Sequence, residues 1–120
     1  MSSLPSLAFV TWFSADPRSA AAFYANFGIV FRQEQHGSGP IHFAFQGQGL
    51  AIELYPANEG MMTEGAGTMI GFEIADADEA ASAAKANGFG VIADVKATAM
   101  GRRVIVRDPD GRQVFLFSTT

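Results

Sequence analysis

The chain has 120 residues, 48% of them hydrophobic, and carries a formal net charge of −4 with no cysteine. This length predicts one domain with a real core, and the lack of cysteine excludes disulfides and thiolate metal sites and favours a reducing, cytoplasmic location. The negative charge argues against a nucleic-acid partner, and we expect no signal peptide and no membrane association, because no apolar run is long enough to span a bilayer.

The first half of the chain predicts one strand, one helix and three further strands. An apolar strand leads to Asp16, which suits a helix N-cap, and Pro17 then occupies the first helical position. The alanine-rich helix ends at Gly28, a residue type that suits the left-handed conformation just past a helix. Strand-like runs follow, with turn-forming residues between them, at residues 29–35, 40–46 and 50–55.

The second half repeats this order sixty positions later, since Asp76 corresponds to Asp16 and Gly88 to Gly28. Its later strand-like runs are at residues 89–95, 102–107 and 113–118. We therefore predict an α+β fold of two βαβββ modules in a single domain over residues 1–120. Each module has a helix on the convex side of its sheet and a half-cup on the concave side. The expected segments are a first module at about 4–56, a joint at 57–67 and a second module at about 68–120.

Alternation along the strands predicts which residues line the half-cups, because successive side chains point to opposite faces. One set is steadily aliphatic and suits packing beneath the helices. The other mixes aromatic, small and acidic residues, which is typical of a ligand cavity. The residues that we expect to line a groove and bind a ligand are Phe9, Thr11, Phe13, Glu53, Tyr55, Met69, Phe115 and Phe117.

Two motifs carry a resemblance to a known family. They are F-S-A-D-P-R-S-A-A-A-F-Y from Phe13 to Tyr24, and M-G-R-R-V-I-V-R-D-P-D-G-R-Q-V-F-L-F from Met100 to Phe117. Together with the paired βαβββ order, they make the chain similar, over essentially its whole length, to the glyoxalase, bleomycin-resistance and extradiol-dioxygenase superfamily (vicinal oxygen chelate fold). The resemblance implies that the two modules form paired half-cups around one groove.

Metal-using members of that family hold their ion at four points, which by the resemblance fall at Phe9, Glu53, Met69 and Phe115. Only Glu53 can bind a hard divalent cation, because phenylalanine has no donor atom and the methionine thioether prefers soft metals. A catalytic zinc site needs about three protein ligands. We therefore expect a member of the family without a metal or cofactor.

The bleomycin-resistance branch of the family lacks a metal and sequesters flat, often cationic antibiotics. The tail that begins at Met100 resembles that branch and its mitomycin-binding relatives, which carry a tryptophan where Met100 stands. The resemblance implies a homodimer that sequesters a planar, cationic antibiotic or metabolite, with Met100 and Arg102 as further ligand-binding residues. Met61 and Met62, in the joint, suit either a pliable lid over the groove or an exposed loop.

An enzyme is the alternative. A glyoxalase-like lyase or isomerase, or a dioxygenase, would use Glu53 as the catalytic base near Thr11, Tyr55 or Glu73, or as a metal ligand together with Glu73 and a histidine. Glu53 has other possible roles as well. It could face a cationic ligand, an arginine such as Arg102 or Arg103, the solvent or a partner subunit.

Several other residues have a plain structural interpretation. His36 and His42 bracket a turn, and we interpret them as exposed loop residues. Trp12 falls on the helix-facing side of its strand by alternation. Arg103, Arg107 and Asp108 suit a structural charge pattern around the final turn.

Overall fold

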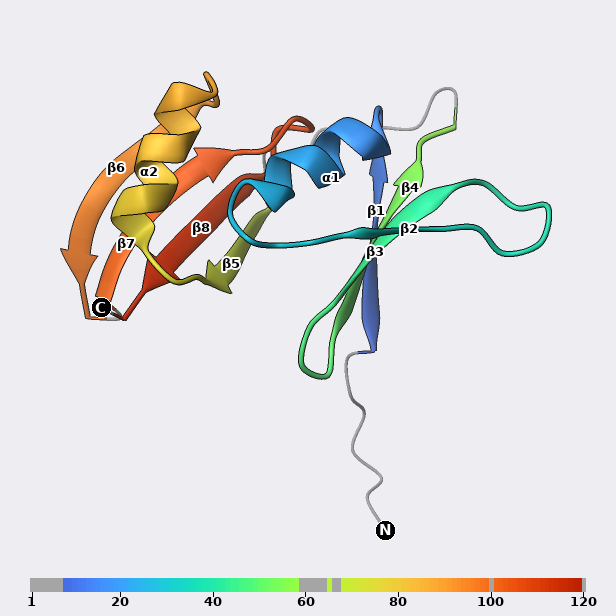
Figure 1. Ribbon diagram of the computed structural model, residues 1–120, viewed down its shortest axis with the longest axis horizontal. Coiled ribbons are helices and arrows are strands. Elements are labelled where there is room, and N and C mark those ends of the chain that lie inside the picture. The colour runs from blue at the N-terminus through green and yellow to red at the C-terminus, as the bar shows by residue number, and fades with distance from the viewer. Residues whose placement is uncertain (1–7, 59–64, 66–67, 100, 120) are drawn as a thin grey trace, which may run out of the picture.

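The structure is a computed structural model that describes residues 8–58, 65, 68–99 and 101–119. Within these residues the chain forms two four-stranded sheets, each accompanied by one helix (Figure 1). Neither helix has the length and apolar character needed to cross a membrane. Met61, Met62 and Met100, predicted as lid or ligand residues, lie outside the described residues.

Both modules have the predicted βαβββ order, which confirms the α+β fold. The first contains β1 (Phe9–Ser14), α1 (Pro17–Ala25), β2 (Arg32–Glu34), β3 (His42–Gln46) and β4 (Ala51–Pro56). The second contains β5 (Met69–Glu73), α2 (Ala77–Ala86), β6 (Val91–Thr98), β7 (Gly101–Arg107) and β8 (Gln113–Ser118). The sheet orders are β1-β4-β3-β2 and β5-β8-β7-β6, and in each sheet the first and last strands of the module pair in parallel.

The two helices begin and end where the repeated residues predict. The side chains of Asp16 and Asp76 each accept a hydrogen bond from a backbone N–H of the first turn, at 3.2 and 3.1 Å. Gly28 and Gly88 follow the helices with φ angles of 80° and 73°, a region that glycine enters without steric strain. Short-range signals therefore account for both helices.

The second strand is shorter than its apolar pattern predicts. It covers only Arg32–Glu34, whereas the expected run began at residue 29. Ile29 and Phe31 are 4% and 8% exposed and belong to the hydrophobic core. The N–H of Ile29 donates to the carbonyl oxygen of Tyr24, which closes the end of α1. The apolar residues before Arg32 thus anchor the connection from helix to sheet.

The two modules share one core. The ring of Phe23 in α1 lies 4.8 Å from the ring of Phe89 in the second module. The ring of Phe72 in β5 packs on both Tyr24 and Phe45, with each pair of centroids 6.0 Å apart. Aromatic pairs at these distances add about 0.5–1.5 kcal/mol each beyond their burial. The seam between the modules is therefore held by aromatic side chains from both.

The turn before β8 forms a buried polar link to the first module. Asp108 accepts hydrogen bonds from the Tyr24 hydroxyl at 2.6 Å and from the Arg112 guanidinium at 3.1 Å. Asp110 accepts a hydrogen bond of 2.6 Å from the Ser14 hydroxyl at the end of β1. The predicted structural role of Asp108 agrees with these contacts, whereas Arg112, which is 4% exposed, was not anticipated. Buried charges of this kind are stable when they are paired and hydrogen-bonded.

Candidate functional site

The first half-cup is centred on Thr11 and Glu53, which lie opposite each other on the parallel strands β1 and β4. The Thr11 hydroxyl donates a hydrogen bond of 3.2 Å to Oε1 of Glu53. Ile52 and Leu54, the neighbours of Glu53 in β4, are buried on the opposite face of the sheet. We call the face away from the helix the cup face. Glu53 is half-buried there, with Thr11 as its hydrogen-bond partner.

Aromatic side chains flank this pair along the two strands. On one side of it, Phe13 lies opposite Tyr55 with ring centroids 6.5 Å apart. On the other side, Phe9 lies opposite Ala51. Phe9 is 59% exposed and Phe13 is 40% exposed, so this cup face is an open apolar surface. The structure thus brings together the predicted site residues of the first module, Phe9, Thr11, Phe13, Glu53 and Tyr55.

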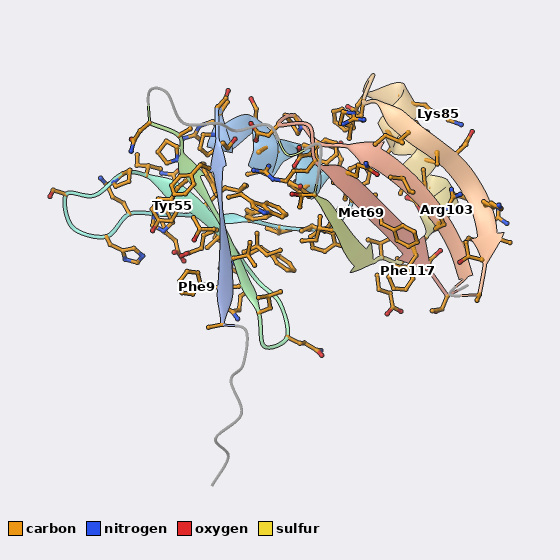
Figure 2. The ribbon with its side chains drawn as sticks, turned by 180° about the vertical axis from the view of Figure 1, so that it is seen from behind. Phe9, Tyr55, Met69, Lys85, Arg103 and Phe117 are labelled. Carbon is orange, nitrogen blue, oxygen red and sulfur yellow. The ribbon has the colours of Figure 1, made fainter. Side chains whose placement is uncertain are left out.

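The second half-cup lies on the face of the other sheet away from α2. Gly71 lies opposite Phe115, and Glu73 lies opposite Phe117. The rings of Phe115 and Phe117 are 6.0 Å apart, and Met69 is 55% exposed. Figure 2 shows Met69 and Phe117 on this side of the sheet. Of the predicted residues of the second module, Met69, Phe115 and Phe117 therefore share a cup face of their own.

The four positions that the family resemblance assigns to metal ligands do not fit a metal. Glu53 offers a carboxylate, but Phe9 and Phe115 have no donor atom, and Met69 offers only a soft thioether. Glu53 and Glu73 stand on different sheets. Among the described residues they belong to no cluster of histidines and carboxylates that could hold an ion. The chemistry of Glu53 is therefore that of a single carboxylate beside a hydroxyl.

Arg102 lies outside the half-cup that was predicted to include it. It pairs with Ser118 across the β7–β8 ladder, on the helix side of the sheet. Its guanidinium binds Asp78 at the start of α2, with an Nε–Oδ2 distance of 2.8 Å. This hydrogen bond and the positive charge hold the pKa of Asp78 below its usual value. The guanidinium of Arg103 instead donates to the carbonyl oxygen of Asp94.

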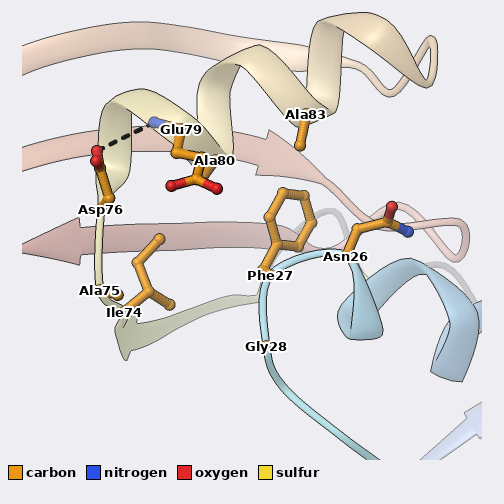
Figure 3. A pocket seen from close by; sticks show the side chains of 9 residues that line it. All are labelled: Asn26, Phe27, Gly28, Ile74, Ala75, Asp76, Glu79, Ala80 and Ala83. Atoms are coloured by element: carbon orange, nitrogen blue, oxygen red, sulfur yellow. Dashed lines mark hydrogen bonds between the residues drawn. The ribbon is translucent and has the colours of Figure 1, made fainter.

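Two hollows lie where the modules meet. One of about 220 Å³ is at the start of α2 (Figure 3) and is lined by residues 26–28 and 74–76 with Glu79, Ala80 and Ala83. Another of about 850 Å³ follows β5 and is lined by residues 27–29 and 71–75 with Phe45 and Gln48. Sequence reasoning missed both, because alternation within one strand carries no information about which segments of two modules meet.

Only one of the two histidines is exposed, although both were predicted to be exposed loop residues. His36 is exposed, but the side chain of His42 is only 1% exposed, so the prediction is wrong for His42. The imidazole of His42 stacks on the ring of Tyr55 with centroids 4.2 Å apart and an interplanar angle of 7°. A signal was available in the sequence, because the expected strand at residues 40–46 contains His42, and alternation gives His42 and Ala44 the same face. In the structure Ala44 pairs with Glu53 on the cup face.

Trp12 lies on the helix side of β1, as alternation predicts. It is half-buried against the core, and the guanidinium carbon of Arg112 lies 4.4 Å from the centroid of the indole ring. A cation over an aromatic face adds about 0.5–2 kcal/mol when it is shielded from water. Trp12 therefore supports the seam between the modules and is no part of the cup faces.

Comparison with solved structures finds the same fold in proteins with different descriptions. TnmS3, an antibiotic binding protein from Streptomyces sp. CB03234, has a TM-score of 0.71 at 18% identity over 100% of both chains. TioX from Micromonospora sp. ML1 has a TM-score of 0.66 at 22% identity, over 97% of this chain and 100% of that chain. A glyoxalase-related enzyme from Fulvimarina pelagi has a TM-score of 0.70 at 17% identity, over 96% of this chain and 88% of that chain.

At these identities the likeness shows the fold and leaves the activity open. A comparison with curated proteins finds no match to this chain. A family model, by contrast, matches residues 6–115, which include both modules. The chain therefore belongs to the Glyoxalase/Bleomycin resistance protein/Dioxygenase superfamily.

Proposed function

We propose that the protein binds a planar, cationic small molecule, an antibiotic or a metabolite, against its cup faces and sequesters it without chemical change. The observation that carries the proposal is the Glu53 carboxylate, held by Thr11 on a surface that is otherwise mainly aromatic. A carboxylate in such surroundings favours a positively charged partner. The fold shared with TnmS3, which is described as an antibiotic binding protein, supports the same class of function.

Aromatic rings would supply most of the contact with a flat ligand. Stacking contributes about 0.5–1.5 kcal/mol for each ring beyond its burial, and a cationic group over a ring adds about 0.5–2 kcal/mol. Phe9 and Phe13 are exposed on the cup face and are available for such contacts. The ligand-binding residues in this proposal are Phe9, Thr11, Phe13, Glu53, Tyr55, Met69, Phe115 and Phe117. Met100, which the family resemblance suggests as a ligand-binding residue, is also part of the proposal.

A homodimer in the cytoplasm completes the proposal. Phe9, Phe13 and Met69 expose 59%, 40% and 55% of their surface, and a large exposed apolar patch favours a partner. A second copy would cover both cup faces and enclose a ligand between them. In this arrangement the ligand is held by two chains, with no metal at the four family positions.

Isothermal titration calorimetry with planar antibiotics tests the proposal. Wild-type protein is titrated with cationic compounds and with uncharged analogues of similar shape. We expect saturable binding of cationic compounds, weakened by at least about tenfold in Glu53→Gln, since a charge-assisted contact of about 1.5–3 kcal/mol is lost. Trp12 fluorescence is an unsuitable reporter, because its ring lies on the helix side of the sheet.

Glu79→Gln is the matched control, because it removes the same charge from the helix α2 beside the hollow in Figure 3. If binding survives Glu53→Gln but weakens in Glu79→Gln, the ligand occupies that hollow, and the cup-face site is refuted. The absence of binding to every cationic compound would refute sequestration of this ligand class.

A glyoxalase-like lyase or isomerase, or a dioxygenase, is the second candidate. The hydrogen bond from Thr11 favours it, because it orients the Glu53 carboxylate as a positioned base would need. Turnover of the methylglyoxal–glutathione adduct by the wild type, lost in Glu53→Gln and retained in Glu79→Gln, would establish lyase activity in place of sequestration.

A further inference from the structure

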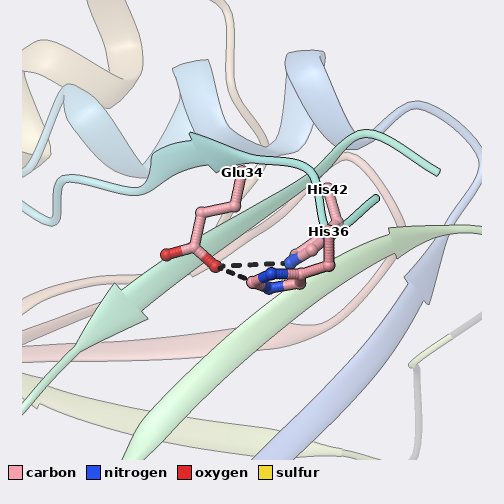
Figure 4. A group of neighbouring side chains, drawn as sticks. All are labelled: Glu34, His36 and His42. Atoms are coloured by element: carbon pink, nitrogen blue, oxygen red, sulfur yellow. Dashed lines mark ion pairs between the residues drawn. The ribbon is translucent and has the colours of Figure 1, made fainter. Parts of the chain in front are cut away.

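The connection between β2 and β3 brings Glu34 together with both histidines of the chain (Figure 4). Oε1 of Glu34 lies 3.3 Å from Nε2 of His42 and 3.7 Å from Nε2 of His36. One ligand atom from each of the three residues lies within 4.8 Å of the others. We propose that Glu34, His36 and His42 bind one divalent transition-metal ion of the zinc class.

The local backbone explains why these residues meet. Glu34 lies opposite His42 in the antiparallel pairing of β2 with β3. The chain then reverses, with the N–H of Gly39 donating to the carbonyl oxygen of His36 at 3.0 Å. Gly37 has a φ of 58°, which glycine adopts without strain. The reversal returns the His36 ring to within 5.1 Å of the His42 ring, measured between centroids.

The imidazole of His42 is held in place before any ion binds. One face stacks on Tyr55, and Nδ1 lies 3.3 Å from the carbonyl oxygen of Pro40. A carbonyl oxygen can only accept a hydrogen bond, so in the neutral imidazole this contact places the proton on Nδ1 and the lone pair on Nε2. A backbone carbonyl that fixes the ring in this way is the usual companion of a metal-binding histidine.

Nε2 of His42 lacks an aligned hydrogen-bond partner among the described residues. This atom is buried. The nearby oxygen of Glu34 is 3.3 Å away but lies outside hydrogen-bond alignment. A lone pair and a carboxylate that face each other both favour a cation between them. Buried polar atoms are rarely left without a partner, so the geometry indicates a ligand at this point.

The donor set suits zinc. Zinc binds imidazole nitrogen and carboxylate oxygen at about 2.0–2.2 Å, which places neighbouring ligand atoms of a tetrahedron roughly 3.3 Å apart. The separations of 3.3 and 3.7 Å from Glu34 are close to this value. The side chain of His36 is 75% exposed and free to close the remaining gap. Three protein ligands leave a fourth position for water or for a donor atom of a bound molecule.

The proposed ion lies at the edge of the first cup face and is distinct from the four family positions. His42 and Ala44 share the face on which Ala44 pairs with Glu53. Glu34 also borders a hollow of about 350 Å³ that Arg32 and Ala44 help to line. The open fourth position would therefore be within reach of a molecule that occupies this hollow.

Metal binding to the full-length chain, purified without a histidine tag and stripped with a chelator, tests the inference. We expect calorimetry to show one equivalent of Zn²⁺ bound, and Co²⁺ to give the intense visible absorption of a tetrahedral site. Glu34→Gln and His36→Ala should each weaken Zn²⁺ binding by at least about tenfold, since each removes one ligand. Both residues are partly or largely exposed, so these variants should fold, whereas replacement of the buried His42 risks the fold.

Glu53→Gln is the matched control, and it should bind Zn²⁺ as the wild type does. Zn²⁺ should also raise the melting temperature of the wild type and of Glu53→Gln, but not that of Glu34→Gln or His36→Ala. The proposal is overturned if the wild type binds no saturable equivalent, or if both hairpin variants bind as tightly as the wild type. If Glu53→Gln is the only variant that loses Zn²⁺ binding, the proposal is also overturned, and the ion is assigned to the family position at Glu53. These measurements of Zn²⁺ binding do not depend on the result of the antibiotic titration, so the two proposals can be refuted separately.

Discussion

The hydroxyl of Tyr24 in α1 donates a hydrogen bond of 2.6 Å to the carboxylate of Asp108, in the turn before β8. Both residues are buried, and they join a helix of the first module to the last strand of the second. Asp108 also receives the guanidinium of Arg112, so the phenol is part of a fully hydrogen-bonded charge network. Removal of one donor from such a network leaves a buried acceptor less well satisfied.

Tyr24→Phe should therefore lower the free energy of unfolding by about 1–3 kcal/mol without changing the fold. Urea unfolding followed by far-ultraviolet circular dichroism measures the change. Tyr55→Phe is the control, because no hydrogen bond from its hydroxyl is seen among the described residues, and its stability should be close to that of the wild type. Equal losses in the two variants would contradict a specific role for the Tyr24–Asp108 contact.

The same contact predicts a loss of stability at alkaline pH. Burial, with a further contribution from the negative charge of Asp108, raises the pKa of the Tyr24 hydroxyl in the folded protein. Above about pH 10 the unfolded chain ionises this phenol while the folded protein keeps it protonated, so the unfolded state is favoured. The free energy of unfolding should fall by up to about 1.4 kcal/mol per pH unit from this group. Tyr24→Phe should show a correspondingly smaller fall between pH 10 and 11, and an unchanged slope would refute the assignment.

The ion pair of Arg102 and Asp78 predicts a modest acid dependence. The pKa of Asp78 is lowered in the folded protein, chiefly by its hydrogen bond from Arg102. Its contribution to stability is therefore present at neutral pH and is lost as the pH falls below about 4. Arg102→Gln should lower the melting temperature at pH 7 but not at pH 2, and salt should reduce the difference because the pair is exposed. Lys96→Gln, which removes another exposed cation of the second module, is the control.

The exposed apolar cup faces predict that two copies of the chain associate through them and that a charged side chain placed on a cup face prevents this association. Phe9→Glu should convert the proposed dimer to a monomer in sedimentation velocity, because Phe9 is 59% exposed at the rim of the first half-cup. Ile41→Glu is the control, since Ile41 is 43% exposed in the connection between β2 and β3. If the wild type sediments as a monomer, or if Ile41→Glu dissociates the dimer equally, the cup faces are not the interface.

Local contacts explain what could be predicted from the sequence. Asp16 and Gly28 mark the ends of α1 through interactions within a few residues, so the ends of this helix can be predicted without knowledge of the fold. Alternation correctly separated Leu54, on the buried face, from Glu53, on the cup face, because a strand has a period of two. Arg102 obeys the same alternation, since it faces α2, but its family motif had suggested a role in the cup.

The sequence by itself determined the two βαβββ modules and the two faces of β1, β4, β5 and β8, because caps, turns and strand alternation act over a few residues. Only the tertiary structure decided the environment of His42 and of Asp108. The burial of His42 depends on a reversed chain that returns His36 to it and on Tyr55 from another strand. Asp108 finds its partner Tyr24 at a separation of 84 residues. Contacts between distant segments depend on how whole elements pack, and no local pattern encodes them.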